Sequence, residues 1–449
     1  PDEALFSSPA IELARSGQMG TAVLAGLIPG IAKVTLWNAP LFMVLLSFIY
    51  TFTGESLLVM RSFSLVLGVG VLYVVAELLE RLRFSRFYVW GIPVLLVLDL
   101  TFSRAANTGR MDMLTLLFLV LAFRQILLLY YAVEPNTRRR LFWAGLYGGL
   151  AVISHPGGAM VIVLYGIFMY RQWQRLLVVL TGFSLPLLGW ALYIIPHFAE
   201  FELQFLSQIV RKAGMLESAT GQSDTGGLLV VFFSQFGSSR MLMIAAAISL
   251  ALAFGVGAIA LRRQKPARPL FGAAVAIFLL VLAGSEAWYA VYVGPFLLIF
   301  VADLDRHQSR WYHRIPLFVV ALFALSSTLI YTIGERQKGT GQAVLPFMKN
   351  VVLATQSCQS VYLRVRPDPY FHLRTARPDL EVLEFIPGKL YYPGIAEALK
   401  HRFKEIDCFL LDGNDSWEPI LTEYLRSESF QVVEVPAMPP LQGVRLLQR

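Results

Sequence analysis

Long apolar stretches recur along the chain from about Leu57 to Tyr331, and they constrain the fold more than any other feature of the sequence. Each stretch approaches the roughly 20 residues that a helix needs to cross a hydrocarbon core about 30 Å thick. The chain is 56% hydrophobic and only 15% charged, whereas soluble domains carry about 25% charged residues. An ordinary soluble protein is therefore excluded, and the pattern predicts a polytopic α-helical membrane protein.

Basic residues gather in alternate loops between the apolar stretches, and this bias predicts how the helices are oriented. The formal net charge is +8, and loops rich in Lys and Arg stay in the cytoplasm. The basic excess is thus a topology signal, so nucleic acid is not expected as a partner. The residues that define the cytoplasmic loops are Arg81, Arg83, Arg86, Arg138, Arg139, Arg140, Arg171, Arg175, Arg262, Arg263, Lys265, Arg268, Arg306, Arg310 and Arg314.

Membrane spans are expected between these loops, about ten in all. Counting from the basic loops places residues 1–56, the loop 197–239 and everything after Gly334 on the outer side. The chain starts at Pro1 without a Met, so we expect an earlier helix to carry the N-terminal segment across the membrane. The predicted spans are residues 57–80, 88–102, 112–131, 141–154, 158–171, 176–196, 240–261, 270–284, 287–303 and 315–333.

Two apolar regions do not fit a simple count of spans. Residues 38–52 would reverse the orientation of the basic loops if they crossed, so we interpret them as an interfacial or re-entrant helix at the outer surface. The short spans 141–154 and 158–171 are separated by the sequence His155-Pro156-Gly157-Gly158. A single long kinked helix is the alternative there, and it would reverse half of the topology.

The composition changes after Gly334 to a mixed, charged type, which predicts a small soluble α/β domain. Its two cysteines, Cys358 and Cys408, fall at or just before predicted strands. They could form a disulfide in an oxidising compartment if those strands are neighbours, and two unpaired thiols are the alternative. The predicted strands are 360–365, 380–385, 407–412 and 430–435, and the predicted helices are 393–403 and 417–427.

The sequence thus divides into three parts. Residues 1–56 form an outer segment with interfacial helices, residues 57–333 a transmembrane bundle, and residues 334–449 an extracytoplasmic α/β domain. Within the bundle, the outer loop 197–239 contains a polar, Gly-rich section at residues 217–227. Such a loop either covers a site or serves as a solvated connector.

Ionisable residues at the outer ends of the predicted helices are the candidate functional groups. A charge near or within a membrane helix is expensive, so it usually has a partner or a function. These ends could converge on one outward-facing cavity. A divalent metal is conceivable there, but no close spacing of ligands supports one, and no cofactor is expected. The candidates are Asp2, Glu3, Arg61, Asp99, Arg104, Arg110, Asp112, His155 and Glu286.

An ordered set of short motifs makes the interpretation more specific. The motifs are Asp2-Glu3, Trp37-Asn38-Ala39-Pro40-Leu41, Phe52-Thr53-Gly54-Glu55-Ser56 leading to Arg61, Ser103-Arg104 through Arg110-Met111-Asp112, Gly145 to His155-Pro156-Gly157, and Trp288-Tyr289 to Pro295. Their order and spacing resemble those of polyprenyl-phosphate-dependent glycosyltransferases of the C-type fold. The protein O-mannosyltransferases and the lipid A aminoarabinose transferases belong to that group.

The resemblance implies transfer of a sugar from a polyprenyl-phosphate carrier to a lipid, glycan or protein acceptor outside the bacterial cytoplasmic membrane. Inverting transfer needs a carboxylate to accept the proton of the acceptor hydroxyl. The resemblance makes Asp2 the expected base, with Glu3 orienting it or binding the sugar. Asp112 matches the second acidic position of the family. It could bind sugar or acceptor, or pair with Arg104 or Arg110, or simply interact with a helix dipole.

Cations are expected to hold the departing lipid phosphate. Arg61, Arg104 and Arg110 are the candidates, and each could instead form a salt bridge or extend to the membrane interface. The remaining substrate-binding candidates are Asn38, His155, Glu286 and Tyr289.

The chain departs from the family pattern at several of its motif positions. Asn38 stands where relatives carry a basic residue, His155 where they carry a Lys, and Leu5 where aminoarabinose transferases place an Arg. His155 could also be a structural turn residue. Tyr289 and Tyr292 could line the cavity or be interfacial anchors. A non-catalytic relative in a membrane complex, or a transporter, is therefore the alternative to an enzyme.

Overall fold

The computed structural model describes residues 2–133, 137–170, 172–210, 268–284, 287–306, 315–338, 340–385, 394–412, 419–437 and 443–449, with isolated positions between 244 and 258 and residues 392 and 441. Contacts divide the chain into two compact units. The bundle unit comprises Arg61–Tyr193 and Lys212–Tyr331. The mixed unit comprises Pro1–Met60, Ile194–Arg211 and Thr332–Arg449.

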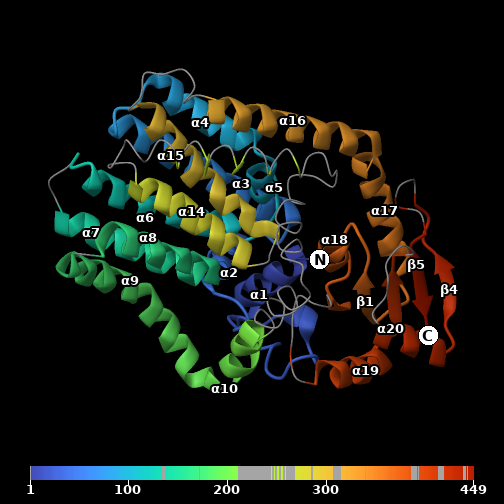
Figure 1. The fold of residues 1–449 in the computed structure, drawn as a ribbon. Helices are drawn as coiled ribbons and strands as arrows, with labels where there is room; N and C mark the ends of the chain where they lie inside the picture. Colours follow the sequence, from blue (N-terminus) through green and yellow to red (C-terminus); the bar gives the residue numbers. More distant parts are fainter. Residues whose placement is uncertain are drawn as a thin grey trace. The chain divides into compact units, whose positions relative to one another are not determined.

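Helices account for the described part of the bundle unit (Figure 1). Apolar residues lie on all sides of α6, as expected of a helix surrounded by other helices. The elements are α3 (Leu57–Arg81), α4 (Arg86–Leu98), α5 (Leu100–Asn107), α6 (Asp112–Tyr130), α7 (Thr137–Ser154), η2 (Pro156–Ala159), α8 (Met160–Met169), α9 (Trp173–Ile194), α14 (Arg268–Ala283), η7 (Ala287–Tyr292), α15 (Val293–Arg306) and α16 (Ile315–Lys338).

Among the described residues, four helical stretches are long and apolar enough to cross a membrane. They are Leu57–Arg81, Asp112–Tyr130, Trp173–Val210 and Trp288–Asp305, and a bent pair of helices, α4 with α5, could supply a fifth. The predicted span 240–261 lies outside the described residues apart from isolated positions. The chain is thus a multi-pass protein by length and composition of its helices, and the larger count of about ten spans stays a prediction.

The predicted span 88–102 is broken at Asp99. Helices α4 and α5 meet there at an angle of 70°, because Asp99 has extended backbone and caps α5 instead of continuing α4. Its carboxylate accepts hydrogen bonds from the backbone N–H of Thr101 at 3.2 Å and from the Thr101 hydroxyl at 2.6 Å. Asp99 therefore has a structural role as a helix cap.

Helices α7 and α8 fold back on one another. The Tyr165 hydroxyl donates to the carbonyl of Ala144 at 2.7 Å, and a Cβ on Gly148 would meet Tyr165 and Val161. These contacts pair late residues of α7 with early residues of α8 and earlier ones with later ones, which defines an antiparallel pair. The predicted break at His155-Pro156 therefore separates two helices, and the alternative of one long kinked helix is not what the structure has.

The mixed unit combines the start of the chain with its C-terminal part. Helix α1 begins one residue from the N-terminus and packs against α2, where Ser7 and Tyr50 share a hydrogen bond of 2.9 Å. At 13 residues, α2 is only about 20 Å long. The elements before the sheet are α1 (Asp2–Ser16), η1 (Ala22–Leu24), α2 (Leu41–Thr53), η3 (Ile195–His197), α10 (Phe198–Phe201), η4 (Glu202–Leu206) and α17 (Thr340–Ala354).

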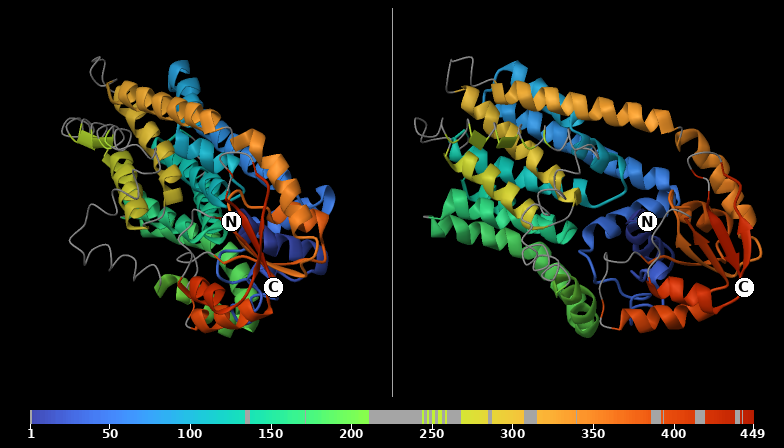
Figure 2. Two further views of the ribbon diagram at one scale, coloured as in Figure 1. Left: turned by 90° about the vertical axis from the view of Figure 1, so that its right-hand side faces the viewer. Right: turned by 45° about the vertical axis from the view of Figure 1, so that its right-hand side comes forward.

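A five-stranded sheet with the order β2-β1-β3-β5-β4 organises residues 360–448. Strands β1, β2 and β3 are parallel, whereas β5 is antiparallel to both β3 and β4. Strand β4 forms one edge (Figures 1 and 2). The elements are β1 (Ser360–Arg364), α18 (Tyr370–Ala376), β2 (Glu381–Leu383), α19 (Ile395–Glu405), β3 (Cys408–Leu411), α20 (Pro419–Ser427), β4 (Gln431–Glu434) and β5 (Arg445–Gln448).

A disulfide joins Cys358 to Cys408 across the neighbouring strands β1 and β3. The two strands are in parallel register with Val361 opposite Cys408, which brings the cysteine Cα atoms to 6.0 Å. This is within the range that a disulfide spans. The condition set by the sequence, that the two strands be neighbours, is met.

Candidate active site

Asp112 and Arg110 form a buried ion pair at the start of α6. The Nε atom of Arg110 lies 2.8 Å from Oδ2 of Asp112, and their side chains are 6% and 0% exposed. The other carboxylate oxygen, Oδ1, accepts a hydrogen bond of 3.2 Å from the hydroxyl of Tyr292. Both oxygens of Asp112 are thus engaged by protein groups, so the carboxylate fixes the positions of Arg110 and Tyr292.

Trp288 brings a second arginine to this pair. The centre of its ring lies 4.5 Å from Cζ of Arg110 and 5.2 Å from Cζ of Arg104. Both distances are within the range of a cation–π interaction. Arg104 belongs to the last turn of α5 and is half-buried, whereas Arg110 is buried. Guanidinium groups suit an anionic group such as a phosphate, and two of them meet at this ring.

His155 and Tyr289 connect the turn after α7 to the same segment, η7. The N–H of Gly157 donates to Nδ1 of His155 at 3.0 Å, which places the proton of the neutral imidazole on Nε2. Nε2 then donates to the Tyr289 hydroxyl, 3.3 Å away. The Tyr289 ring lies 6.0 Å from that of Tyr292. The bundle unit therefore brings together Arg104, Arg110, Asp112, His155 and Tyr289 around η7.

The structure gives less information about the remaining candidates in the bundle unit. Arg61 is exposed in the first two turns of α3. Glu286 lies outside the described residues. Among the residues that the structure describes, no three His, Cys, Asp or Glu side chains gather as a metal site would require.

The expected base belongs to the mixed unit, at the start of α1. The side chain of Asp2 lies outside the described part of the structure, and Glu3 is half-buried. Helix α1 is fixed by the ring contact of Phe6 with Trp37, at 5.4 Å between centroids, as well as by the Ser7 bond to Tyr50. Burial raises the pKa of Tyr50, so its hydroxyl remains protonated and acts as a neutral hydrogen-bonding group.

Asn38 follows Trp37 in the mixed unit and is buried. Its Oδ1 accepts the backbone N–H of the next residue, Ala39, at 2.8 Å. The side chain thus bonds to its own local backbone. Its predicted role in binding substrate stays a prediction, as do the roles of Asp2 and Glu3.

Trp288 was not predicted as a site residue, and the sequence left Tyr292 open between lining the cavity and anchoring at the interface. Tyr292 is fully buried and bound to Asp112, so it is not an anchor at the lipid interface. Their spacing of four residues was a weak signal, because it places side chains on one face of an α-helix but not of a 3₁₀ helix such as η7. Aromatic residues near a membrane surface are so common that the spacing alone did not separate this role from an anchor.

The comparisons with known proteins concern the class and the fold of the chain. Residues 14–206 match the family model of the dolichyl-phosphate-mannose-protein mannosyltransferases. The crystal structure of ArnT from Cupriavidus metallidurans bound to undecaprenyl phosphate is similar over 100% of this chain and 93% of that chain, with a TM-score of 0.62 and 13% sequence identity. ArnT in the apo state gives a TM-score of 0.59 at 13% identity over the same shares of both chains. None of the curated proteins matches the chain.

The fold and the family match define a class: the chain is a multi-pass membrane glycosyltransferase of the C-type fold with a small C-terminal α/β region. Within that class it resembles the protein O-mannosyltransferases in residues 14–206 and ArnT in its architecture. The class and fold predicted from the order of the motifs are thereby confirmed.

Proposed function

We propose that the protein transfers a sugar from a polyprenyl-phosphate carrier to a lipid, glycan or protein acceptor on the outer side of a bacterial cytoplasmic membrane, with inversion at the anomeric carbon. The arginine cluster on Trp288 is the observation that carries this proposal. A half-buried cation in the last turn of α5 and a buried one just before the apolar helix α6 suit a phosphate whose lipid tail stays in the membrane. ArnT, which shares the fold, was solved with undecaprenyl phosphate.

Arg104 and Arg110 have different roles in this proposal. Arg104 is half-buried and approaches Trp288 from α5, so it contacts the phosphate oxygens and stabilises the charge that develops on the leaving group. Arg110 is tied to Asp112, so it holds Trp288 and adds to the positive potential at the site. Asp112 is then a positioning residue, and no proton transfer is assigned to it.

Asp2 is the proposed general base, and Glu3 assists by orienting it or by binding the sugar. The base takes the proton of the acceptor hydroxyl while the hydroxyl oxygen bonds to the anomeric carbon and the bond from that carbon to the phosphate oxygen breaks. The electron pair of the broken bond leaves with the lipid phosphate, where the arginines offset its charge. This assignment rests on the motif order around Asp2-Glu3 and on the chemistry that the reaction needs.

The experiment is turnover of a radiolabelled polyprenyl-phosphate sugar in proteoliposomes. Asp2→Asn is expected to lower kcat by about two to four orders of magnitude, as loss of a general base does, with little change in KM. Arg104→Gln is expected to raise the KM for the lipid donor and to lower kcat, because it removes a contact to the charge of the leaving group. Glu3→Gln is the matched variant for the neighbouring carboxylate.

The alternative, a non-catalytic relative, makes a different forecast. A non-catalytic relative would bind the lipid phosphate without transferring the sugar. Neither the wild type nor Asp2→Asn would then show turnover. Undiminished turnover in Asp2→Asn, with a full loss in Glu3→Gln, would move the base to Glu3 and leave the class unchanged.

A further inference from the structure

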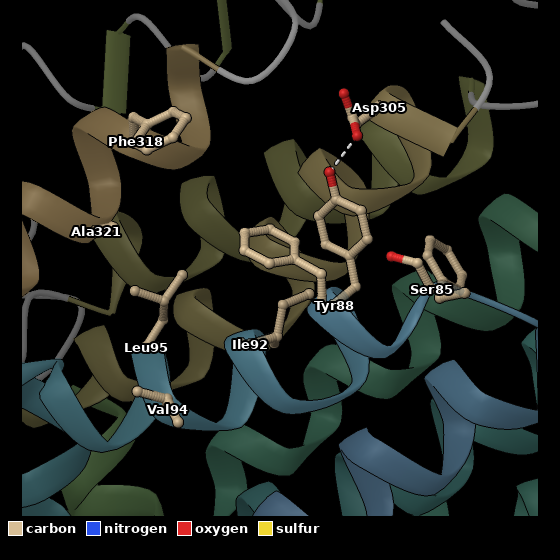
Figure 3. Close-up of a pocket in the computed structure, with 11 residues that line it drawn as sticks. Ser85, Tyr88, Ile92, Val94, Leu95, Asp305, Phe318 and Ala321 are labelled. Atoms are coloured by element: carbon tan, nitrogen blue, oxygen red, sulfur yellow. Dashed lines mark hydrogen bonds between the residues drawn. The ribbon is translucent and has the colours of Figure 1, made fainter. Parts of the chain in front are cut away.

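A cavity in the bundle unit lies between α4, α15 and α16 (Figure 3). Its volume is about 730 Å³. Most of the lining is apolar and comes from successive turns of α4, with Phe318 and Ala321 of α16 on another side. The lining residues are Phe84, Ser85, Phe87, Tyr88, Gly91, Ile92, Val94, Leu95, Asp305, Phe318 and Ala321. None of them belongs to the candidate active site.

The cavity has one polar end. Ser85 precedes α4, Asp305 lies in the last turn of α15, and Phe318 lies in the first turn of α16, so all three mark ends of their helices. From Ser85 to Leu95 the lining follows ten residues of α4, about 15 Å. That length is half of a hydrocarbon core of about 30 Å. The dimensions therefore suit one fatty-acyl chain within a single leaflet.

The cavity is open at its side. Phe87 and Phe318 are 64% and 69% exposed, although both are large and apolar. On Gly91 an added Cβ would meet no atom within 4 Å, so the space in front of this residue is empty of protein. In a membrane protein, such a surface faces hydrocarbon, and a chain can enter from the bilayer.

Charges of both signs lie at the polar end. The hydroxyl of Tyr88 donates to the carboxylate of Asp305, and Figure 3 shows both groups at the edge of the cavity. Arg83 and Arg86 are exposed in the turn that leads into α4. Among the described residues, neither of these arginines pairs with a carboxylate. A headgroup with a phosphate and an ammonium matches both signs, whereas one with only negative charge matches the arginines alone.

We propose that the cavity binds one aminophospholipid of the phosphatidylethanolamine type. One acyl chain follows α4 past Gly91, the phosphate lies beside Arg86 and Arg83, and the primary ammonium donates to Asp305. A trimethylated choline headgroup fits less well, because it has no N–H to donate to the carboxylate. The basic end of this cavity is the one that the charge bias assigns to the cytoplasmic leaflet.

The test is native mass spectrometry of the full chain after extraction from nanodiscs that contain equal amounts of phosphatidylethanolamine, phosphatidylglycerol and phosphatidylcholine. The wild type is expected to retain one phosphatidylethanolamine. Gly91→Trp fills the cavity and is expected to lower this retention by about tenfold or more, whereas Gly91→Ala, which adds only a Cβ to open space, retains the lipid.

Asp305→Asn keeps an acceptor for Tyr88 but removes the charge, so it is expected to abolish the preference for phosphatidylethanolamine over phosphatidylglycerol. This variant tests the proposal even if Gly91→Trp fails to fold. Retention of phosphatidylglycerol, phosphatidylcholine or an added polyprenyl phosphate in place of phosphatidylethanolamine would overturn the proposal. Equal retention in Gly91→Trp and Gly91→Ala would overturn it as well.

Discussion

Arg110 and Asp112 show how one buried charge fixes the position of another. Removing either ion from water costs several kcal/mol, and attraction to the other ion offsets part of that cost. Asp112 is fully buried and its second oxygen is held by Tyr292. The ion pair therefore holds the arginine cluster in position. Its contribution to the stability of the protein can be measured separately from turnover.

We predict that Asp112→Asn and Arg110→Gln each destabilise the protein by about 3 to 5 kcal/mol, since each leaves one buried charge without its partner. The double variant should lose less than the sum of the two. Unfolding in detergent, followed for both single variants and the double, measures this coupling. A stable Asp112→Asn protein with no turnover would instead make Asp112 a catalytic residue.

Trp288 offers a second test at this scale. Replacing it with Leu removes both ring contacts to Arg104 and Arg110, so we predict a rise of about three- to thirtyfold in the KM for the lipid donor. Trp288→Phe keeps a smaller aromatic face and should restore part of the affinity. The kcat values of the two variants should differ less than their KM values. Equal KM values for Leu and Phe would show that the ring contributes only volume.

The residue types at the site were largely predictable, but their contacts were not. Asp112, Arg104 and Arg110 stand close in sequence at the outer end of a predicted helix, and intramembrane charges are informative by themselves. Asp99 belonged to the same set, yet it caps α5. The sequence alone does not distinguish an acidic residue that caps a helix from one that pairs with an arginine. The path of the folded backbone decides which group each carboxylate reaches.

Close packing of backbones joins α7 to α9. A Cβ on Gly182 of α9 would lie 2.2 Å from the carbonyl oxygen of Phe142, and one on Gly145 of α7 would lie 1.9 Å from that of Val179. Small residues allow such contact between membrane helices, where van der Waals packing drives association. Gly189, on the same helix as Gly182, would meet nothing within 4 Å.

We predict that Gly182→Ala destabilises the protein by about 1 to 3 kcal/mol, because the helices must separate. Gly189→Ala is the matched control and should be neutral or stabilising by up to about 1 kcal/mol. Thermal unfolding of both variants in the same detergent gives the comparison. Similar melting temperatures for the two variants would mean that the close approach of α7 and α9 contributes little to the free energy of unfolding.

Elements with strong local patterns were predictable, and those that depend on distant partners were not. The four predicted strands match β1 to β4 closely, since each is a short apolar run between turns. Strand β5 and helix α18 were missed. At seven residues, α18 is too short to show a helical period. Strand β5 is no shorter than β3 and β4, but it depends on the hydrogen bonds that those two strands supply.

At the scale of the chain, the mixed unit joins segments that are far apart in sequence. Glu12 of α1 pairs with Arg374 of α18 at 3.0 Å, and the N–H of Glu384 donates to the carbonyl of Val23 at 2.9 Å. The sequence suggested residues 1–56 and 334–449 as separate parts, because the composition of a segment does not show which distant segment it contacts. Because both segments pack into one unit, we expect them on the same side of the membrane.

The disulfide tests which side that is. Cys358 and Cys408 remain bonded only in an oxidising compartment, whereas cytoplasmic thiols stay reduced. We predict that acid-quenched, denatured protein from intact cells takes up no alkylating reagent before reduction and labels both cysteines after it. Arg139→Cys, an exposed position in a predicted cytoplasmic loop, supplies the matched control and should label without reduction. Labelling of Cys358 and Cys408 before reduction would place the mixed unit in the cytoplasm, reverse the topology read from the basic loops, and remove the outer-side acceptor from the proposed reaction.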